Sequence, residues 1–419
     1  MGVRARGARA RRARGRARIA RRVSLGVLLA VLALGWAVAA YFLWQTDVPG
    51  DLPHVDEHAL FSAAQLDQAE DYDRFVRWDF VVSQLVLLGA IAAYAVWGAR
   101  FVRESAAGRI GTGMLLAMLG LGILWLVRLP FGFAEVWWQR RHDISRVGYG
   151  EWIIGSWFSL GSEFLFVCLA ILIVMGLAGP LGDWWWIPGG FVFASLALLF
   201  TFLLPYLIAE QRALRDPELQ SQAREYEQEL DLGHIPIRVQ PVGTETTSPN
   251  AAAVGLGPTR RVIIWDTLLD GRFTEQEEGV VVAHELAHHA RQHLWKGIAW
   301  YALFALPGAF VIARVTRRRG GMASPEAVPL SLLVLSVLTL LALPLQNVIT
   351  RHMEAEADWS ALKLTEDPEA AKGLFQGFTR TALADPSPPT WAYVLLENHP
   401  TIVQRVGLAE EWEEEQGEP

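Results

Sequence analysis

The residues best suited to chemistry lie in the stretch VVAHELAHHARQHLW, residues 281–295. Within it, His284, Glu285 and His288 form the pattern H-E-x-x-H. Two histidines four residues apart on a helix face the same side, so both imidazoles can reach one metal ion. Neutral imidazoles suit zinc, which keeps one coordination position open for water in catalytic sites. The metal lowers the pKa of that water toward about 7, and Glu285 can accept its proton as a general base.

A third protein ligand is expected from the later stretch NVITRHMEAEADWSAL, residues 347–362. Glu354 and Glu356 are both candidates, but on a helix they point about 200° apart and cannot share one role. Asp358 lies one turn after Glu354 on the same face, where a carboxylate can hydrogen-bond a ligating histidine. Arg351 lies on this face as well. The spacing therefore favours Glu354 as the ligand and leaves Glu356 outside the site.

The helix that carries H-E-x-x-H is predicted to begin at the capping-box sequence T-x-x-E, residues 274–277. Residues 280–296 contain no glycine or proline, so one continuous helix is expected. On that helix His289 points about 100° away from the second motif histidine, which indicates a polar supporting role. His293 points about 180° away from the first motif histidine and is expected to be exposed.

The composition of the chain predicts a membrane protein. Of its 419 residues, 52% are hydrophobic and only 19% are charged, whereas soluble domains carry about 25% charged residues. A helix needs about 20 apolar residues to cross the hydrocarbon core of a bilayer. Seven runs meet or approach this length and predict about seven transmembrane helices; they lie at 24–44, 79–98, 111–133, 155–177, 185–208, 298–314 and 327–349.

The apolar runs predict a mainly α-helical polytopic membrane protein. Polar segments between them divide the chain into parts. Two β-like pieces in the first polar region, IPIRVQPV and RRVIIWDTLL, add a small sheet beside the H-E-x-x-H helix, as in a zincin-like metalloprotease domain. The single cysteine, Cys168, excludes a disulfide framework and a cysteine zinc site. The predicted parts are an Arg-rich tail (1–22), five transmembrane helices (23–208), a polar catalytic region (209–297), two transmembrane helices (298–349), and a C-terminal catalytic region with an acidic tail (350–419).

The two motif segments together resemble the type I CAAX prenyl endopeptidases, a family of integral-membrane zinc metalloproteases. The family pattern is H-E-x-x-H followed by N-x-x-x-R-x-x-E-x-x-A-D, and the heat-shock membrane protease HtpX is a more distant relative. The resemblance implies that Glu354 is the third zinc ligand and that the membrane helices enclose a water-filled chamber. The residues that fit the second part of the pattern are Asn347, Arg351, Glu354, Ala357 and Asp358.

Two further segments resemble the same family. SPNAAAVGLGPTRRVIIWDTLLDG is similar to its edge strand, which implies that Asn250 and Ala251 bind an extended peptide by β-augmentation. Residues 252–253 are alanines where the family carries aromatic residues, which implies altered substrate pockets. ENHPTIVQRV is similar to the late H-P-x-x-x-x-R element. This resemblance implies that His399 stabilises the tetrahedral intermediate and that Arg405 orders the site.

These features predict a membrane-embedded zinc metalloendopeptidase of the EC 3.4.24 type, similar to CAAX prenyl proteases, with one Zn²⁺ per chain. The expected partners are the lipid bilayer and a peptide or protein substrate, including membrane-associated or lipidated ones; nucleic acid is not expected. Two alternatives stay open. One is a zinc-containing membrane binding or regulatory protein with lost or minimal peptidase activity, and the other is an HtpX-like quality-control protease.

Charge predicts how this multi-pass protein lies in a bacterial-type plasma membrane. Residues 1–22 hold ten arginines and no acidic residue, which indicates a cytoplasmic N-terminus by the positive-inside rule. The basic loop RVTRRRGG falls on the same side in a seven-helix count, so the catalytic regions fall on the opposite side. The family resemblance implies a cytosolic active site instead. The two lines conflict, and the charge pattern is given slightly more weight.

Overall fold

The structure is a computed structural model that divides into two compact units, Met1–Thr46 and Asp47–Pro419. In the first unit the described residues include an apolar helix, Ala30–Leu43. The predicted Arg-rich tail and part of the first predicted transmembrane run, 24–44, lie outside the described residues. The residues that the structure describes are 26–27, 30–50, 52–100, 107–208 and 210–417.

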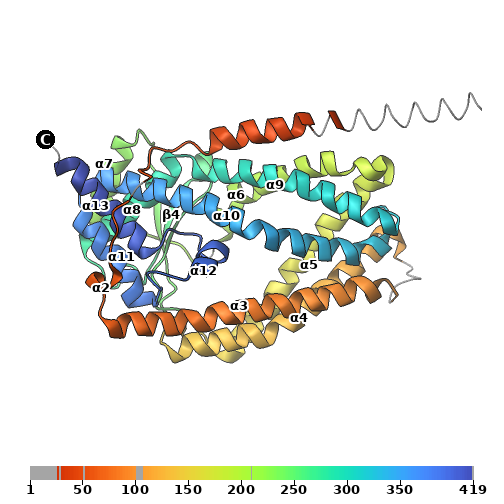
Figure 1. The fold of residues 1–419 in the computed structure, drawn as a ribbon, viewed down its shortest axis with the longest axis horizontal. Helices are drawn as coiled ribbons and strands as arrows, with labels where there is room; N and C mark the ends of the chain where they lie inside the picture. The colour runs from red at the N-terminus through yellow and green to blue at the C-terminus, as the bar shows by residue number, and fades with distance from the viewer. Residues whose placement is uncertain (1–25, 28–29, 51, 101–106, 209, 418–419) are drawn as a thin grey trace, which may run out of the picture. The chain divides into compact units, whose positions relative to one another are not determined.

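Six helices among the described residues of the second unit are long and apolar enough to cross a membrane (Figure 1). Each overlaps one of the six predicted runs that follow the first, so these predictions are confirmed. The last helix continues well beyond its apolar run, which carries the N-x-x-x-R-x-x-E-x-x-A-D motif away from the apolar part of the bundle. The six helices are α3 (Ala63–Trp97), α4 (Gly108–Arg141), α5 (Tyr149–Leu181), α6 (Trp186–Leu207), α9 (His293–Thr316) and α10 (Val328–Thr365).

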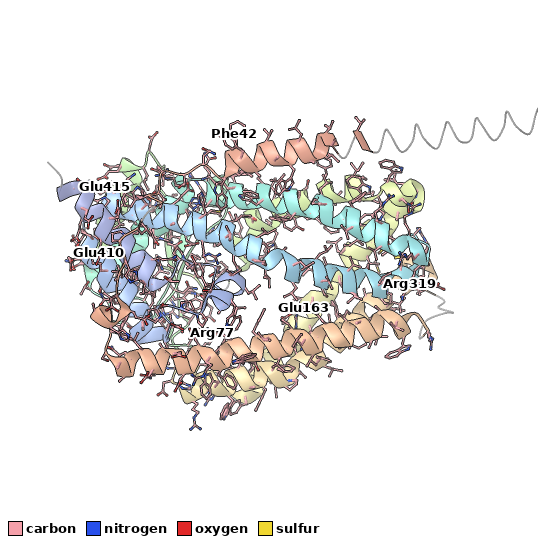
Figure 2. The ribbon with its side chains drawn as sticks, viewed as in Figure 1. Phe42, Arg77, Glu163, Arg319, Glu410 and Glu415 are labelled. Carbon is pink, nitrogen blue, oxygen red and sulfur yellow. The ribbon has the colours of Figure 1, made fainter. Side chains whose placement is uncertain are left out.

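The six long helices form a bundle in which α3 packs on α4, α4 on α5, α6 on α9, and α10 on both α3 and α9. A cavity of about 540 Å³ lies between α5, α6, α9 and α10, and mainly apolar side chains line it. At one end of the bundle the loops are joined by arginines: Arg317 pairs with Asp183 at 2.8 Å, and Arg319 donates to the Ala95 carbonyl. Figure 2 shows Arg319 at this end, and Glu410 and Glu415 at the opposite end.

The end opposite Arg319 carries a small polar domain, residues 210–292 and 350–417, which we call the cap (Figure 1). One apolar core holds it together, with Val282 and Leu286 of α8, Ile264 of β4, and Trp359 and Phe375 from the later helices all buried. The C-terminal part of α10 packs against α8 inside this core. Apart from that part of α10, the helices of the cap are α7 (Pro217–Glu229), α8 (Glu275–Ala290), α11 (Pro368–Ala382), α12 (Thr390–Leu395) and α13 (Ile402–Gly417). The short helix α2 (Glu57–Leu60) precedes α3.

A four-stranded sheet with the order β1-β2-β4-β3 covers one side of α8. Strands β2 and β4 are parallel, whereas β1 pairs with β2 and β3 pairs with β4 in antiparallel fashion. Both predicted strand pieces are confirmed, and β3 lies at the edge of the sheet, beside α8. The strands are β1 (Arg212–Ala213), β2 (Ile237–Gln240), β3 (Ala251–Val254) and β4 (Arg261–Trp265).

Helix α8 begins as predicted, because the Thr274 hydroxyl accepts from the Glu277 amide and the Glu277 side chain accepts from the Thr274 amide. The prediction of one continuous helix up to residue 296 is wrong. Helix α8 ends at Ala290, and Gln292 takes a left-handed conformation with φ of 58° before α9 begins at His293. A left-handed residue redirects the chain, so the side chains after it no longer follow the rotation of α8.

Candidate metal centre

Three side chains from α8 and α10 bring one donor atom each to a common point. His284 Nε2 lies 3.1 Å from His288 Nε2 and 3.2 Å from Glu354 Oε2, and the third side, from His288 Nε2 to Glu354 Oε2, is 3.6 Å. We call these three atoms the donor triangle. Ligand atoms about 2.0–2.1 Å from a tetrahedral zinc ion stand about 3.3 Å apart. The donor triangle therefore has the dimensions and the chemistry of a zinc site.

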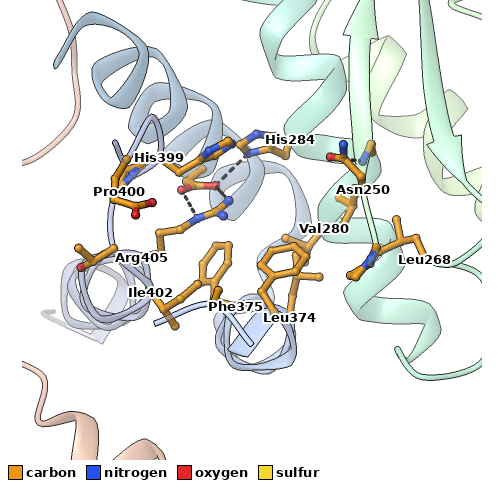
Figure 3. A pocket seen from close by; sticks show the side chains of 18 of the residues that line it. Asn250, Leu268, Val280, His284, Leu374, Phe375, His399, Pro400, Ile402 and Arg405 are labelled. Atoms are coloured by element: carbon orange, nitrogen blue, oxygen red, sulfur yellow. Dashed lines mark hydrogen bonds and ion pairs between the residues drawn. The ribbon is translucent and has the colours of Figure 1, made fainter. Parts of the chain in front are cut away.

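His284 is held in place from behind by a buried carboxylate. Its Nδ1 donates to Asp358 Oδ1 at 2.8 Å, which turns Nε2 toward the donor triangle. Arg405 of α13 in turn donates to both oxygens of Asp358, from Nε at 2.8 Å and from Nη2 at 2.6 Å (Figure 3). This arrangement of carboxylate and histidine is the one that fixes the tautomer and raises the basicity of metal-ligating histidines. Sequence spacing had predicted the place of Asp358.

The acceptors around His284 favour the protonated form of its imidazole when no metal is bound. Burial lowers the pKa of its imidazole, but the hydrogen bonds to Asp358 and Glu354 outweigh burial and raise that pKa to about 10 in the metal-free protein. The side chain therefore keeps a proton at neutral pH until a cation displaces it. Metal binding at the donor triangle would be coupled to proton release.

Glu285 and His399 flank the donor triangle. The buried side chain of Glu285 lines both of the cavities that meet at the triangle. His399, from the loop before α13, places Nε2 3.2 Å from Glu354 Oε2, while its Nδ1 lies 2.8 Å from Asn398 Oδ1. Its side chain is about half exposed, at 49%. The structure thus brings the two residues predicted to act on the substrate beside the predicted ligands.

Arg351 and Asn347 tie α10 to the chain segment that leads to His399. Arg351 donates to the Tyr393 carbonyl at 2.8 Å and to the Glu397 carbonyl, and its guanidinium lies 4.2 Å from the centroid of the Tyr393 ring. The Asn347 amide lies 3.4 Å from the Val394 carbonyl. Both residues are buried. They therefore hold the loop that carries His399 and do not approach the donor triangle themselves.

Two cavities meet at the donor triangle and share Asn250, Ala251 and His399 among their lining residues. The apolar pocket, about 280 Å³, lies toward α11 (Figure 3) and is named for its apolar lining residues Leu268, Val280, Val281, Leu374, Phe375 and Phe378. Charged side chains, among them Asp385, Glu397 and Arg405, also line it. The alanine pocket, about 330 Å³, lies along β3 and is lined by Ala251, Ala252 and Ala253. An extended chain beside β3 would pass from one pocket to the other across Glu285.

The edge strand is correctly oriented to pair with a further chain. The Trp265 amide donates to the Asn250 carbonyl at 2.9 Å, and Ala252 stands opposite Ile263 of β4 in the antiparallel register. Because backbone groups alternate along an antiparallel strand, Ala251 and Ala253 turn their N–H and C=O groups away from β4. The Ala251 C=O and both outward groups of Ala253 are available at the open edge beside the donor triangle, whereas the Ala251 N–H donates to Asn250 Oδ1 at 2.9 Å.

Two residues near the donor triangle lie where sequence reasoning did not place them. His293, expected to be exposed, is 4% exposed, and its ring packs beneath His288 because the chain turns at Gln292. Glu356 stays outside the donor triangle as predicted, yet it is fully enclosed and contacts His293. The spacing of residues in the sequence does not predict this contact. It depends on the turn at Gln292, which contains no glycine or proline.

His289 links α8 to the sheet. Its Nε2 lies 3.2 Å from the Arg261 carbonyl oxygen of β4. Burial lowers the pKa of its imidazole to about 4, so the ring is neutral at pH 7. A neutral ring can donate to that carbonyl, which agrees with the predicted polar supporting role and separates His289 from the metal ligands.

The fold and the donor triangle place a candidate metal site in a protein with six described helices that are long and apolar enough to span a membrane. Residues 213–413, slightly less than half of the chain, match the model of peptidase family M48. Its structure is similar to the crystal structure of S. mikatae Ste24p, with a TM-score of 0.65 at 16% identity, over 91% of this chain and 96% of that one.

In sequence the chain is 27% identical, over 302 residues, to the uncharacterized metalloprotease YhfN of Bacillus subtilis (strain 168), which covers 69% of this chain and 71% of that protein. It is also 26% identical to the CAAX prenyl protease 1 homologs of Oryza sativa subsp. japonica and Arabidopsis thaliana. These two matches cover 58% and 57% of this chain and 60% and 58% of the plant proteins, less than two thirds of their length.

Proposed function

We propose that this protein is a zinc metalloendopeptidase that cleaves peptide bonds within the membrane environment. The observation that carries the proposal is the donor triangle of His284, His288 and Glu354, with Glu285 lining both cavities beside it. A general base next to a three-ligand metal site that keeps one position open is the arrangement needed for metal-assisted hydrolysis.

Each residue has a separate task in the proposed reaction. Zinc, when bound, acts as a Lewis acid that polarises the scissile carbonyl and acidifies water. Glu285 accepts the proton of the attacking water and passes it to the leaving amine. His399, half exposed beside Glu354, donates a hydrogen bond to the oxyanion that forms on the substrate carbonyl. Arg405 and Asp358 hold His284 in position for the metal.

The proposed substrate is a peptide that lies extended along β3. The outward N–H and C=O groups of Ala253 and the outward C=O of Ala251 would pair with its backbone. The apolar pocket and the alanine pocket would then receive its side chains on either side of the scissile bond. The similarity to CAAX prenyl protease 1 homologs supports a membrane-associated or lipidated protein as the substrate class.

Removal and return of the metal tests the proposal. Purified protein should lose cleavage of a fluorogenic peptide library after treatment with a zinc chelator, and added Zn²⁺ should restore it, with about one zinc ion per chain. Mg²⁺ should not restore cleavage, because it favours oxygen ligands over imidazoles. If the chain binds zinc but cleaves no peptide before or after chelation, it is a zinc-containing binding or regulatory protein instead.

A further inference from the structure

The turn between α8 and α9 places a second histidine directly behind His288. With Gln292 in the left-handed conformation, His293 Nδ1 comes to 2.8 Å from His288 Nδ1. The two rings are nearly perpendicular, with an interplanar angle of 73° and centroids 4.9 Å apart. His293 is thus in contact with a proposed metal ligand while lying outside the donor triangle.

Behind His293 stands a buried carboxylate. His293 Nε2 lies 2.9 Å from Glu356 Oε2, and the same oxygen lies 2.9 Å from Lys296 Nζ. Glu356 is 2% exposed, and it is among the largest side chains that are fully buried. A carboxylate at such depth is costly unless hydrogen bonds and a counter-charge compensate it. His293 and Lys296 provide both.

The positions of the protons in this chain of contacts follow from the chemistry of each group. A ligating histidine presents a lone pair to its metal, so His288 keeps Nε2 bare and carries its proton on Nδ1. The short contact between the two Nδ1 atoms needs one donor and one acceptor, so His293 accepts there. A neutral His293 then carries its proton on Nε2, and it donates that proton to Glu356.

We propose that His293 and Glu356 are positioning residues for the metal, which fix the tautomer and orientation of His288 as a ligand. The inference rests on the proposed function, because it gives His288 the role of a zinc ligand. The two histidine ligands are then supported in matching ways. His284 donates directly to Asp358, and His288 reaches the charge of Glu356 through the ring of His293.

We call the chain of contacts from His288 through His293 to Glu356 the relay. It gives the Nδ1 proton of His288 an acceptor. Without His293, the Nδ1 proton of His288 would lose its acceptor in a half-buried position, and the imidazole could rotate or change tautomer. Such outer partners of metal-ligating histidines change metal affinity by about 10- to 100-fold when they are removed. A loss in this range is expected for the relay.

The test measures the zinc dissociation constant of full-length protein in detergent by competition with a chromophoric chelator. Glu356→Gln keeps the shape of the side chain but removes its charge, and it should weaken zinc binding about 10- to 100-fold. His293→Phe should weaken it similarly, because the ring stays but both nitrogens are lost. The absorption spectrum of the cobalt-substituted protein should shift in both variants, since the ligand field at His288 changes.

Two other variants separate a role toward the metal from a structural one. Glu227→Gln is the matched control, because Glu227 is also buried and also contacts a histidine, His234 at 3.2 Å, but belongs to α7 far from the donor triangle in the sequence. It should leave zinc affinity and the cobalt spectrum unchanged. Lys296→Met removes the counter-charge of Glu356 but keeps the contacts from Glu356 through His293 to His288, so zinc should bind more tightly than in Glu356→Gln.

The outcomes are distinct. Wild-type zinc affinity in folded Glu356→Gln and His293→Phe proteins overturns the inference, and so does an equal loss of affinity in Glu227→Gln. If His293→Phe does not fold, the nearly isosteric Glu356→Gln decides the matter. A wild-type chain that binds no zinc overturns the proposed function together with the inference, whereas a zinc-binding wild type with unaffected variants overturns the inference alone.

Discussion

Glu354 and Glu356 lie two residues apart on α10, and their carboxylates contact two different histidines, His284 of α8 and His293 at the start of α9. Glu354 Oε2 lies 3.2 Å from His284 Nε2 in the donor triangle, whereas Glu356 Oε2 lies 2.9 Å from His293 Nε2 behind it. The divergence follows from helix geometry, since positions two apart point about 200° from each other. Helix α10 thus provides one carboxylate to the donor triangle and a second carboxylate to the histidine that contacts His288.

We predict that Glu285→Gln retains the metal and loses hydrolysis. The amide keeps the size of the side chain but cannot accept a proton from water, and general-base catalysis contributes about 10²- to 10⁴-fold to such reactions. Zinc content per chain and the cleavage rate of a sensitive peptide should be measured on the same preparation. Normal cleavage by this variant would show that Glu285 is not the base.

We predict that Asp358→Asn weakens zinc binding about 10- to 100-fold, because His284 loses a charged acceptor. The same change leaves the buried guanidinium of Arg405 without its partner, and breaking a buried ion pair costs about 3–5 kcal/mol. Chemical denaturation of the metal-free proteins measures this cost. The double variant with Arg405→Gln should recover part of the stability but not the zinc affinity, and equal stability of Asp358→Asn and wild type would contradict the prediction.

Helix periodicity predicts which side chains share a face wherever the residues lie on one uninterrupted helix. His284, Glu285 and His288 on α8, and Glu354 and Asp358 on α10, face each other as their spacing predicts. The membrane helices and the start of α8 are likewise predictable from sequence. A membrane helix requires a long apolar run, and a helix N-terminus favours capping residues. The pairing of the two helices itself is a tertiary contact, and the family resemblance supplied it.

Periodicity failed at His293 because the backbone, not the side-chain pattern, decides its place. The chain turns at Gln292, which takes the left-handed conformation. That conformation usually falls to glycine, so the residue type at this position does not mark the turn. The contact between His293 and Glu356 joins residues that are 63 positions apart. Neither residue shows its burial in sequence, since glutamate usually lies at the surface and histidine is intermediate in burial.

We predict that Ala253→Pro impairs peptide cleavage without disrupting the sheet. Proline removes the outward N–H of Ala253 and is tolerated on edge strands, whose inner hydrogen bonds it leaves intact. The loss of one substrate hydrogen bond, about 1–3 kcal/mol, corresponds to about a 5- to 150-fold fall in kcat/KM. Ala253→Val keeps the N–H and changes only the space in the alanine pocket, so it separates the loss of the hydrogen bond from a loss of room. If both variants cleave with the wild-type rate constant, the substrate does not pair with this strand.

We predict that Glu278→Gln stabilises the cap at pH 8 and not at pH 4.5. Burial, followed by repulsion from Asp216 and Glu275, raises the pKa of Glu278 from 4.5 to about 7. The folded state therefore binds more protons than the unfolded state between these values, so stability falls as the pH rises through this window. The partly exposed site limits the gain at pH 8 to about 1 kcal/mol.

Thermal unfolding of the metal-free proteins at both pH values tests this prediction. The control is Glu218→Gln, which removes an exposed acid from the first turn of α7 and should leave the Tm unchanged or slightly lower. A Tm of Glu278→Gln that differs equally from the wild type at pH 4.5 and pH 8 would refute the role of this carboxyl.

We predict that the cap faces the side of the membrane opposite the cytoplasm. The loop that carries Arg317–Arg319 and the cap lie at opposite ends of the bundle, and α9 and α10 each connect them by a single crossing. Clustered arginines in a short loop favour the cytoplasmic side. In a bacterial host, alkaline phosphatase fused after residue 419 should therefore be active, whereas the same reporter fused after Gly320 should be silent. The reverse pair of results would place the donor triangle in the cytoplasm, and the arginines would then not determine the orientation.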